Sequence, residues 1–451
     1  MNRLPILSRA PSPSPGGVVL VDMPWTRDKD PRVPLGHASL AASLLGAGIA
    51  VAPVVAPVNS DPFSVASVHQ RVLDAARPFG PSVVIAIGAY VWCEPFVQQL
   101  LPVLAAALPD ARIVVGGPQV SFADDVRGLY PESTCVVRGA GEAAIVALAS
   151  APFGAAIAGV VWTGLPDGGG QARVDLDSLP SPFLTGVVPV RRGGFVRWET
   201  QRGCPHKCSF CQHRNRDAVA VQRLPEGRIY EEIALFARTG VADIAILDPI
   251  FNAGKRSERI LESCRSQGLT ARLSVQARLE STDQRFLDAA RGLDLRLEFG
   301  LQTVHEAEGV AIQRSNRMDR AERNLGLVRD SGHPFEVSLI YGLPNQTLAS
   351  FRESVAWCLE RGVPTIKAFP LMLLRGTELD RQRDEWGLVE DGAVIPQVIA
   401  SSTFGPEEHA QMAGLSEALR RTEGSHPPIG QLLSMAKTMA PSAARFSPVA
   451  A

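Results

Sequence analysis

Three closely spaced cysteines constrain this chain more than any other feature of its sequence. Cys204, Cys208 and Cys211 lie in the run GCPHKCSFC, residues 203–211, with gaps of three residues and then two. Three thiolates on one short loop can bind three irons of a cubane iron–sulfur cluster. No fourth cysteine lies nearby in the sequence, so the fourth iron keeps an open coordination position, which separates a reactive metal site from a structural one.

Two other uses of cysteine fit this spacing less well. A zinc site usually has four ligands, commonly in Cys-x2-Cys pairs, so His206 or His213 would have to supply the fourth. A disulfide framework is disfavoured because seven cysteines in 451 residues are sparse and odd in number. We expect residues 1–16 to be a flexible leader and not a signal peptide.

The composition excludes several classes of partner. A chain of 451 residues has room for two or three domains, and 45% hydrophobic with 20% charged residues is ordinary for a globular protein. The net charge of −1 gives no general attraction to nucleic acid. No apolar run reaches the ~18 residues that span a bilayer. We therefore expect a cytoplasmic protein without a nucleic-acid or membrane partner.

Strands and helices alternate through residues 17–163. The pattern predicts strands at 18–23, 50–55, 81–88, 112–115 and 135–138, with helices at 38–45, 64–76, 94–108 and after Glu142. Such alternation favours a doubly wound parallel sheet with helices on both faces, which binds ligands beyond the carboxyl ends of its strands. Glycines stand at those ends in this chain, and glycine lets the backbone approach a flat ligand closely.

A second series of strands and helices follows a proline-broken linker predicted at 164–192. Strands are expected at 195–200, 242–248, 273–278, 295–302, 336–341 and 365–369, within a domain spanning 193–385. On strand 295–302, Glu298 should share a face with Arg296 and Gly300, while the apolar residues between them face the helices. Residues 386–451 predict a few helices and a low-complexity tail.

The cysteine loop resembles that of the radical SAM superfamily. In that family the open iron binds the amino and carboxylate groups of S-adenosylmethionine (SAM), and Phe210 matches an aromatic position whose backbone lies near the adenine. The six strand–helix units resemble the family's partial (β/α)6 barrel, whose reactive groups sit at the carboxyl ends of the strands. The resemblance therefore implies a four-iron, four-sulfur (4Fe–4S) cluster and SAM as cofactors.

The first domain resembles the cobalamin-binding domain of B12-dependent radical SAM enzymes. The resemblance rests on three motifs, Pro-x-Gly at 34–36, Gly-Gly-Pro-Gln at 116–119 and Arg-Gly-x-Gly-Glu at 138–142. The implied fold is α/β: a Rossmann-like cobalamin-binding domain, a partial radical SAM barrel and a short helical C-terminal segment. A degenerate domain that binds no cofactor is the alternative.

One motif of many cobalamin proteins is absent from the sequence. The run Asp-x-His-x-x-Gly, which supplies a histidine below the cobalt, does not occur, because Asp30 and His37 are too far apart. The resemblance thus implies a cobalt without a protein imidazole beneath it. Trp92 would cover that lower face, or it is a half-buried packing residue.

The strand-end rule and the family motifs together nominate the site residues. Each is either a ligand contact or a structural hydrogen-bonding residue. Glu298 and Tyr341 are the candidates for proton transfer. The predicted SAM contacts are Phe210, Asp248, Gln276, Arg278 and Gln302. The predicted cobalamin contacts are Trp25, Pro34, Gly36, His37, Trp92, Gly116, Gly117, Pro118, Gln119, Gly139, Gly141 and Glu142.

The resemblance implies a cobalamin-dependent radical SAM C-methyltransferase with an external electron donor. Its substrate would be a small molecule or peptide of antibiotic biosynthesis, and the short C-terminal segment is similar to that of tryptophan C2 methyltransferases. Methyl transfer by a radical route suits an unactivated carbon, whereas a polar route suits an aromatic one. The alternatives are a B12-dependent radical rearrangement, oxidation or cyclisation, and a non-catalytic cobalamin and cluster sensor.

Overall fold

The computed structural model describes residues 16–27, 34–126, 128–213 and 221–439. The chain divides into two compact units. Unit 1 comprises Met1–Thr26, Gly36–Ser121 and Asp125–Val174, and unit 2 comprises Arg27–Leu35, Phe122–Asp124 and Asp175–Ala451. The predicted leader, apart from Gly16, and the end of the predicted tail lie outside the described residues.

Unit 1 contains one six-stranded sheet in the order β2-β1-β3-β4-β5-β6. Every residue of β1 is buried, because helices cover both faces of the sheet. The first five strands are parallel, as predicted, and only β6 runs antiparallel, beside β5. The strands are β1 (Val18–Asp22), β2 (Val51–Val55), β3 (Val84–Gly88), β4 (Arg112–Gly116), β5 (Cys135–Val137) and β6 (Val160–Trp162).

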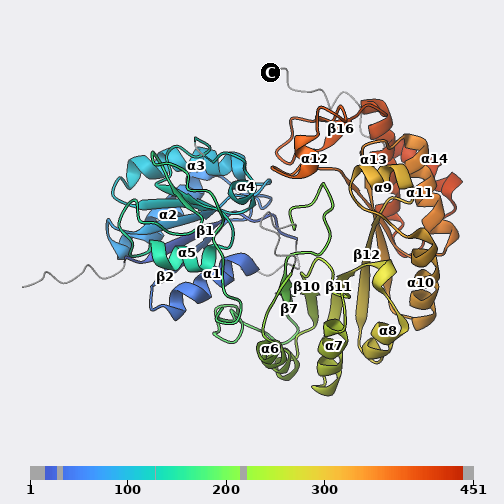
Figure 1. Ribbon diagram of the computed structural model, residues 1–451, viewed down its shortest axis with the longest axis horizontal. Helices are drawn as coiled ribbons and strands as arrows, with labels where there is room; N and C mark the ends of the chain where they lie inside the picture. The colour runs from blue at the N-terminus through green and yellow to red at the C-terminus, as the bar shows by residue number, and fades with distance from the viewer. Residues whose placement is uncertain (1–15, 28–33, 127, 214–220, 440–451) are drawn as a thin grey trace, which may run out of the picture. The chain divides into compact units, whose positions relative to one another are not determined.

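The helices of unit 1 form two layers, one on each face of its sheet (Figure 1). On one face α1 (Leu35–Gly46) lies beside α5 (Gly141–Leu148), because Ser39 Oγ donates a 2.9 Å hydrogen bond to Glu142 Oε1. On the other, α2 (Val65–Ala76) packs against α3 (Glu94–Ala107). The short α4 (Pro118–Ser121) follows β4, and a 3-10 turn, η1 (Arg77–Phe79), follows α2. The sheet order reverses between β1 and β3, where ligands of such folds bind.

Unit 2 is built on six parallel strands that follow one another in chain order, β7-β10-β11-β12-β13-β14. No pairing joins β14 to β7 within the described part of the chain, so the sheet is the predicted partial barrel. The side chains of β12 alternate between buried and half-buried, which confirms the predicted inner face of Arg296, Glu298 and Gly300. The strands are β7 (Phe195–Trp198), β10 (Asp243–Ile246), β11 (Arg272–Ala277), β12 (Leu295–Gln302), β13 (Phe335–Tyr341) and β14 (Ile366–Pro370).

Helices between these strands cover the outer face of the curved sheet (Figure 1). They are α6 (Glu226–Thr239), α7 (Arg256–Ser266), α8 (Gln284–Ala290), α10 (Met318–Ser331) and α11 (Leu348–Glu360). The predicted helical C-terminal segment contains α13 (Pro406–Arg421), which packs on β14, and α14 (Ile429–Met439), which packs on α13. The remaining short helices are η2 (Leu279–Ser281), α9 (Glu306–Ala311) and α12 (Glu378–Arg381). Two small antiparallel sheets pair β8 (Gln201–Arg202) with β9 (Gln222–Arg223) and β15 (Val389–Glu390) with β16 (Val398–Ala400).

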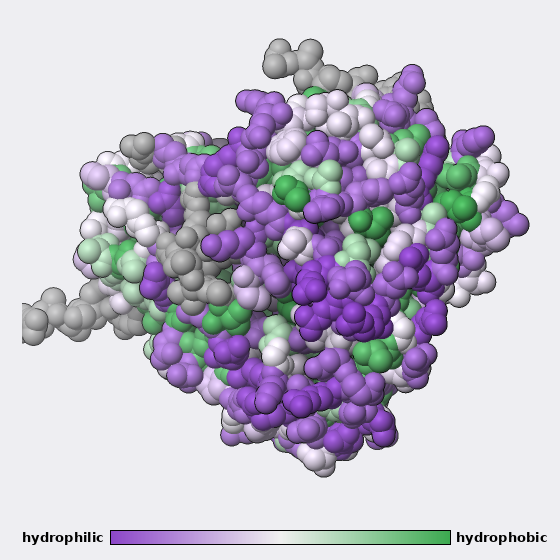
Figure 2. All heavy atoms as spheres, turned by 45° about the vertical axis from the view of Figure 1, so that its right-hand side comes forward, coloured by the Kyte–Doolittle hydropathy of each residue, from purple (hydrophilic) through white to green (hydrophobic). Residues whose placement is uncertain are grey.

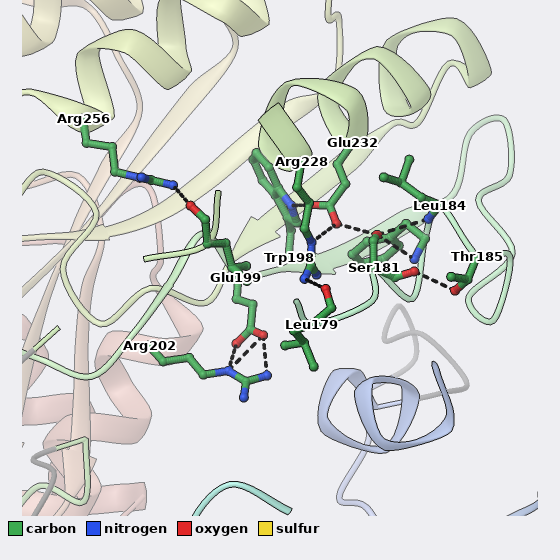
Figure 3. Close-up of polar contacts among 12 residues, drawn as sticks. Leu179, Ser181, Leu184, Thr185, Trp198, Glu199, Arg202, Arg228, Glu232 and Arg256 are labelled. Atoms are coloured by element: carbon green, nitrogen blue, oxygen red, sulfur yellow. Dashed lines mark hydrogen bonds and ion pairs between the residues drawn. The ribbon is translucent and has the colours of Figure 1, made fainter. Parts of the chain in front are cut away.

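The segment 175–192 is part of unit 2 and not the linker that its prolines suggest. Figure 3 shows Ser181 and Trp198 both pointing at the carboxylate of Glu232, on α6. Ser181 Oγ donates to Glu232 Oε1 at 2.5 Å and Trp198 Nε1 donates to Oε2 at 2.6 Å. Arg228 binds the same carboxylate at 2.9 Å and also donates to the carbonyl of Leu179 at 2.8 Å. These bonds fix the segment on α6, so the predicted linker 164–192 is wrong over its second half.

The face of the molecule in Figure 2 has no large continuous hydrophobic patch. In the view of Figure 2, hydrophilic residues dominate and hydrophobic ones gather only in small, scattered groups. Among the described residues, no helix has both the length and the apolar character needed to cross a membrane.

Removing the carboxylate of Glu232 should destabilise unit 2. The side chain is fully buried, and Glu232→Ala leaves the guanidinium of Arg228 and the Trp198 N–H without their acceptor. Loss of one partner from a buried ion pair costs about 3 kcal/mol. Urea unfolding followed by tryptophan fluorescence measures this loss. The control is Glu231→Ala, at an exposed neighbour, expected to change the unfolding free energy by less than about 0.5 kcal/mol. Equal stability of the two variants would contradict the assignment.

Candidate functional site

The cysteine loop is anchored from both sides by residues far away in the sequence. Ser209 N donates to the carbonyl of Ile312 at 2.9 Å, and Leu379 N donates to the carbonyl of Ser209 at 2.9 Å. Inside the loop, the described backbone bond is the 3.2 Å contact from Cys211 N to the carbonyl of Cys208. The placement of the three thiols therefore depends on the barrel around them and not on the loop alone.

Asp248 fixes the turn that leads into this loop. Its carboxylate accepts hydrogen bonds from Thr200 N at 2.8 Å, Thr200 Oγ1 at 2.5 Å and Gln201 N at 3.2 Å. Burial raises the pKa of Asp248 to about 6, against the opposing effect of the bonds from Thr200. Asp248 was predicted to contact SAM, but its oxygens are used by this turn and it does not line the cavity described next.

One cavity of about 360 Å³ lies at the carboxyl ends of the barrel strands. All three cysteines line it, together with Phe210 and the side chains of His206 and His213. The predicted residues Gln276, Arg278, Glu298 and Gln302 also line it, so the structure brings together eight of the residues that the sequence nominates around one space. The wall on the β13–β14 side is mostly apolar, with Ser338 as its polar member and with Ile340, Phe369, Pro370, Leu371, Met372 and Leu374.

Tyr341 does not lie with these residues. On β13, Ser338 and Ile340 line the cavity, so the alternation of the strand turns Tyr341 to the helix-facing side. Its ring packs 5.7 Å from that of Phe351 and 5.3 Å from that of His409, and burial raises its pKa. The prediction that Tyr341 assists proton transfer in this cavity is therefore corrected.

Two arginines bring positive charge to the cysteines, and sequence reasoning found only one of them. Arg278 forms a 2.9 Å ion pair with Glu280 and donates to the carbonyl of Ser315 at 3.2 Å. Arg314, in the segment after α9, lies 3.8 Å from Cys208 Sγ through its Nη1 atom. It ends no strand and belongs to no motif, so the sequence carried no signal for it.

The thiols are set in a partly apolar environment. Burial raises the pKa of Cys204, although a backbone N–H of His206 and the two arginines oppose the shift. Burial also raises the pKa of Cys211, to about 11, again against a bond from His213 N. These thiols therefore hold their protons at neutral pH until a metal displaces them.

Glu298 lies on the inner face of β12, between neighbours of both signs. It is in register with Gln276 on β11 and with Glu336 on β13. Burial and the negative charge of Glu336 raise the pKa of Glu298, while Lys367 and Arg296 oppose the shift. Lys367 Nζ forms a 2.9 Å ion pair with Glu336, and the same charge opposes the rise in the pKa of Glu298.

The end of β12 is irregular where Gln302 meets the cavity. Its φ of 73° is rare for a residue with a side chain, and the pairing with β13 shifts register between Gly300 and Gln302. A Cβ at Gly300 would lie 2.7 Å from Gln302 Nε2. Gly300 thus makes room for the Gln302 amide to lie across the strand toward the cavity.

In unit 1, polar and aromatic residues gather at the switch point between β1 and β3. Asp22 ends β1 and His37 opens α1, with Asp22 Oδ2 3.9 Å from His37 Nδ1. Asp22 Oδ1 and His37 Nε2 are buried without a hydrogen-bond partner within the described residues. The half-buried Trp92 stacks on Tyr90 at 4.8 Å and donates to the carbonyl of Met23 at 3.2 Å.

Several of the predicted cobalamin contacts are already engaged within the chain. A Cβ at Gly117 would lie 2.6 Å from the carbonyl oxygen of Ala89, and one at Gly139 would lie 2.4 Å from that of Ala172. Gln119 donates to Glu94 at 2.6 Å, and Glu142 accepts from Ser39. Glycine at 117 and 139 is therefore required by the packing of the chain. Five other nominated residues of unit 1 follow the carboxyl ends of strands or open helices, namely Trp25, which is 49% exposed, Gly36, Gly116, Pro118 and Gly141. Pro34 belongs to unit 2.

No group of three or more His, Cys, Asp or Glu side chains converges as a site for a metal ion within the part of the chain that the structure describes.

In the unsubstituted chain, the contributions of Asp22 and His37 to the pH dependence of folding stability should cancel. A substitution of either residue alone should make the contribution of the other measurable. Burial raises the pKa of Asp22 to about 7 and lowers that of His37 to about 4. Between pH 4 and 6.5 the unfolded chain therefore carries a proton on His37, and the folded chain carries one on Asp22 instead. The proton counts are equal, so the two contributions to the pH dependence of stability cancel.

Asp22→Asn leaves only the histidine, so stability should rise with pH from about 4 to 6.5. His37→Gln leaves only the carboxyl, so stability should fall as pH rises from about 4 to 7. Each slope should approach about 1.4 kcal/mol per pH unit relative to the unsubstituted chain. Urea unfolding across this pH range measures both slopes, and parallel curves for all three proteins would contradict the pairing.

The sequence of this chain is similar to those of radical SAM proteins. A sequence profile of the radical SAM superfamily matches residues 198–358. The cobalamin-dependent radical SAM methyltransferase TokK of Streptomyces tokunonensis is 28% identical over 311 residues, which are 62% of this chain and 45% of TokK. A 2-(S-pantetheinyl)-carbapenam-3-carboxylate methyltransferase of Streptantibioticus cattleyicolor gives the same identity and coverage. The chain thus spans 45% of the length of each of these relatives.

Two solved structures are similar over most of the chain. The radical SAM methyltransferase TsrM from Kitasatospora setae, with tryptophan and a SAM analogue bound, has a TM-score of 0.69 at 16% identity and covers 94% of this chain and 96% of its own. The cobalamin-dependent radical SAM enzyme OxsB, with aqua-cobalamin and SAM bound, has a TM-score of 0.68 at 14% identity and covers 93% of this chain and 70% of its own. Residues 198–358 therefore match the radical SAM superfamily, in a chain whose fold is similar to those of TsrM and OxsB.

Proposed function

We propose that this chain is a cobalamin-dependent radical SAM methyltransferase that methylates a carbon atom of a small molecule in natural-product biosynthesis. One observation carries the proposal: Cys204, Cys208, Cys211 and Phe210 line a single cavity at the carboxyl ends of six parallel strands. The names of TokK and of the carbapenam methyltransferase support methyl transfer as the reaction. When bound, the cluster would supply an iron with an open position, SAM the methyl group and cobalamin its carrier.

The donor set of the cavity fits a cluster better than a single ion. Three thiols from one loop share the wall, and the described part of the wall includes no fourth cysteine. Because Cys204 and Cys211 hold their protons, cluster binding has to release them, as metal binding to thiols does. Arg278 and Arg314 offset the negative charge that this release leaves behind.

The remaining wall fits a zwitterionic ligand such as SAM. Arg278 and Arg314 suit a carboxylate, and the amides of Gln276 and Gln302 suit an amine or ribose hydroxyls. The apolar side, with Ile340, Phe369 and Leu371, suits an aromatic ring. Glu298 is the candidate proton acceptor, because its raised pKa makes its carboxylate a stronger base than an ordinary glutamate.

Cobalamin is assigned to the carboxyl edge of the sheet in unit 1. The unpartnered Asp22 Oδ1 and His37 Nε2 atoms fit a ligand with amide groups, because each buried polar atom needs a partner. Trp92, already fixed by its bond to Met23, fits the role of covering one face of a flat ring. Gly117 and Gly139 add no support, since the chain itself requires them.

The substrate is proposed as a small molecule, with an external one-electron donor supplying reducing equivalents. A cavity of about 360 Å³ is within the range of small-molecule sites. Tryptophan is the first compound to test, because it is the substrate bound to TsrM and because one wall of the cavity is apolar.

Anaerobic purification should yield a protein with both iron–sulfur and corrinoid absorption. Cys208→Ala should lose most of its iron and sulfide while keeping the corrinoid, because the cysteine loop and the switch point lie in different units. Metal analysis and absorption spectra measure both cofactors. Zinc in place of iron, or full iron in the variant, would overturn the cluster assignment. With methyl-labelled SAM, a product without label would favour a rearrangement, oxidation or cyclisation instead.

Gly300→Ala should weaken SAM binding by forcing the Gln302 amide away from the cavity. We expect the Kd to rise about tenfold, the loss of roughly 1.4 kcal/mol expected for one hydrogen bond. Equilibrium dialysis with labelled SAM measures the change on cluster-loaded protein. Gly227→Ala is the matched control, since it lies in α6 with open space around it and should leave the Kd unchanged. Equal Kd values for both variants would rule Gln302 out as a SAM contact.

A further inference from the structure

The guanidinium of Arg314 is held against one cysteine without a carboxylate ion pair in the described part of the chain, although the charge of Glu280 acts on it from a longer distance. Nη1 donates to Cys208 Sγ at 3.8 Å, and Nη2 donates to the carbonyl of Gly300. Arg314 is 8% exposed, and its Nε atom is buried without a partner within the described residues. No carboxylate among those residues forms an ion pair with it, whereas the neighbouring Arg278 is paired with Glu280 at 2.9 Å.

The backbone holds Arg314 in this position. Arg314 N donates to the carbonyl of Gly309 at 2.8 Å, and a Cβ at Gly309 would lie 2.8 Å from the carbonyl oxygen of Arg314. Asn316 Nδ2 donates to the carbonyls of Leu301 and Thr303, at 2.8 and 2.9 Å. Together with the Ser209–Ile312 bond, these contacts join the arginine segment to the cysteine loop.

We infer that Arg314 raises the reduction potential of the cluster by hydrogen bonding to the Cys208 thiolate, an inference that rests on the proposed function. Reduction adds one electron from a low-potential one-electron donor, with no bond made or broken, and places one more negative charge on the cluster and its sulfurs. A fixed cation at one of those sulfurs stabilises the reduced state more than the oxidised state. Water cannot screen this interaction well, because Arg314 is buried.

The choice of arginine fits this role. A guanidinium stays protonated even when burial lowers its pKa, as it does here. Its planar fork allows Nη1 to face the sulfur while Nη2 is fixed by the carbonyl of Gly300. A lysine at the same place would keep the charge but would not make both contacts, which separates the effect of the charge from that of the hydrogen bond.

The test is a redox titration of the cluster, followed by electron paramagnetic resonance, in the full-length protein without SAM or substrate. Arg314→Gln should lower the potential by about 59 mV, which corresponds to a tenfold change in the one-electron equilibrium. Arg314→Lys should lie between this variant and the unsubstituted protein. Arg278→Gln is the matched control and should shift the potential less, because Glu280 already offsets that charge. The iron–thiolate stretching bands in resonance Raman spectra should change only in the Arg314 variants.

The possible outcomes separate this inference from the proposed function. Equal potentials for the unsubstituted protein and both Arg314 variants, all with full clusters, would overturn this inference and leave the proposed function intact. An equal shift from Arg278→Gln and Arg314→Gln would also overturn it, because a general field and not the bond to Cys208 would then be the cause. If Arg314→Gln loads poorly, Arg314→Lys decides by the same criteria. Absence of a cluster from the unsubstituted protein would overturn the proposed function together with this inference.

Discussion

The site depends on backbone hydrogen bonds that connect the cysteine loop to segments far away in the sequence. A loop with three thiols has little structure of its own, and Ser209 gains its position from Ile312 on one side and Leu379 on the other. Asp248 fixes the entrance of the loop through Thr200 and Gln201. The position of the three thiols therefore depends on the folded barrel around them. Because the two contacts of Ser209 use only backbone atoms, the three cysteines can be recognised in a sequence while Ile312 and Leu379 cannot be recognised as their supports.

Much of the fold and part of the site followed from the sequence, because both depend on periodicity. Parallel strands end at one edge, so Gln276 and Arg278 were expected at the cavity that they line, and the alternation of β12 gave the inner face of Glu298. The same alternation on β13 would have excluded Tyr341, since its apolar positions run through 335, 337, 339 and 341. Tyr341 was nominated only because it ends its strand, although the alternation of that strand pointed the other way. Arg314 was beyond reach, because a residue in an irregular segment is positioned only by tertiary contacts.

Glycine and proline were the least reliable guides. Gly117 and Gly139 were assigned to ligand approach, but the carbonyls of Ala89 and Ala172 lie where their Cβ atoms would be. A glycine in a sequence indicates that something lies close to the backbone at that position. It does not indicate whether that neighbour is a ligand or another part of the chain. Similarly, Pro180 and Pro182 suggest a linker, yet Ser181 between them is buried and bonded to Glu232. Proline restricts the backbone, but it does not indicate whether the segment packs against the rest of the domain.

Positive and negative side chains line different parts of the barrel. Arg278 and Arg314 stand at the level of the cysteines, and Glu298 and Glu336 stand side by side on neighbouring strands. Arg296 and Lys367 bind Glu336 and leave Glu298 as the carboxyl that faces the cavity. The two sets act in opposite directions, since the arginines stabilise negative charge on sulfur while burial and the charge of Glu336 make Glu298 a better proton acceptor. A single cavity can thus favour electron uptake at one wall and proton uptake at another.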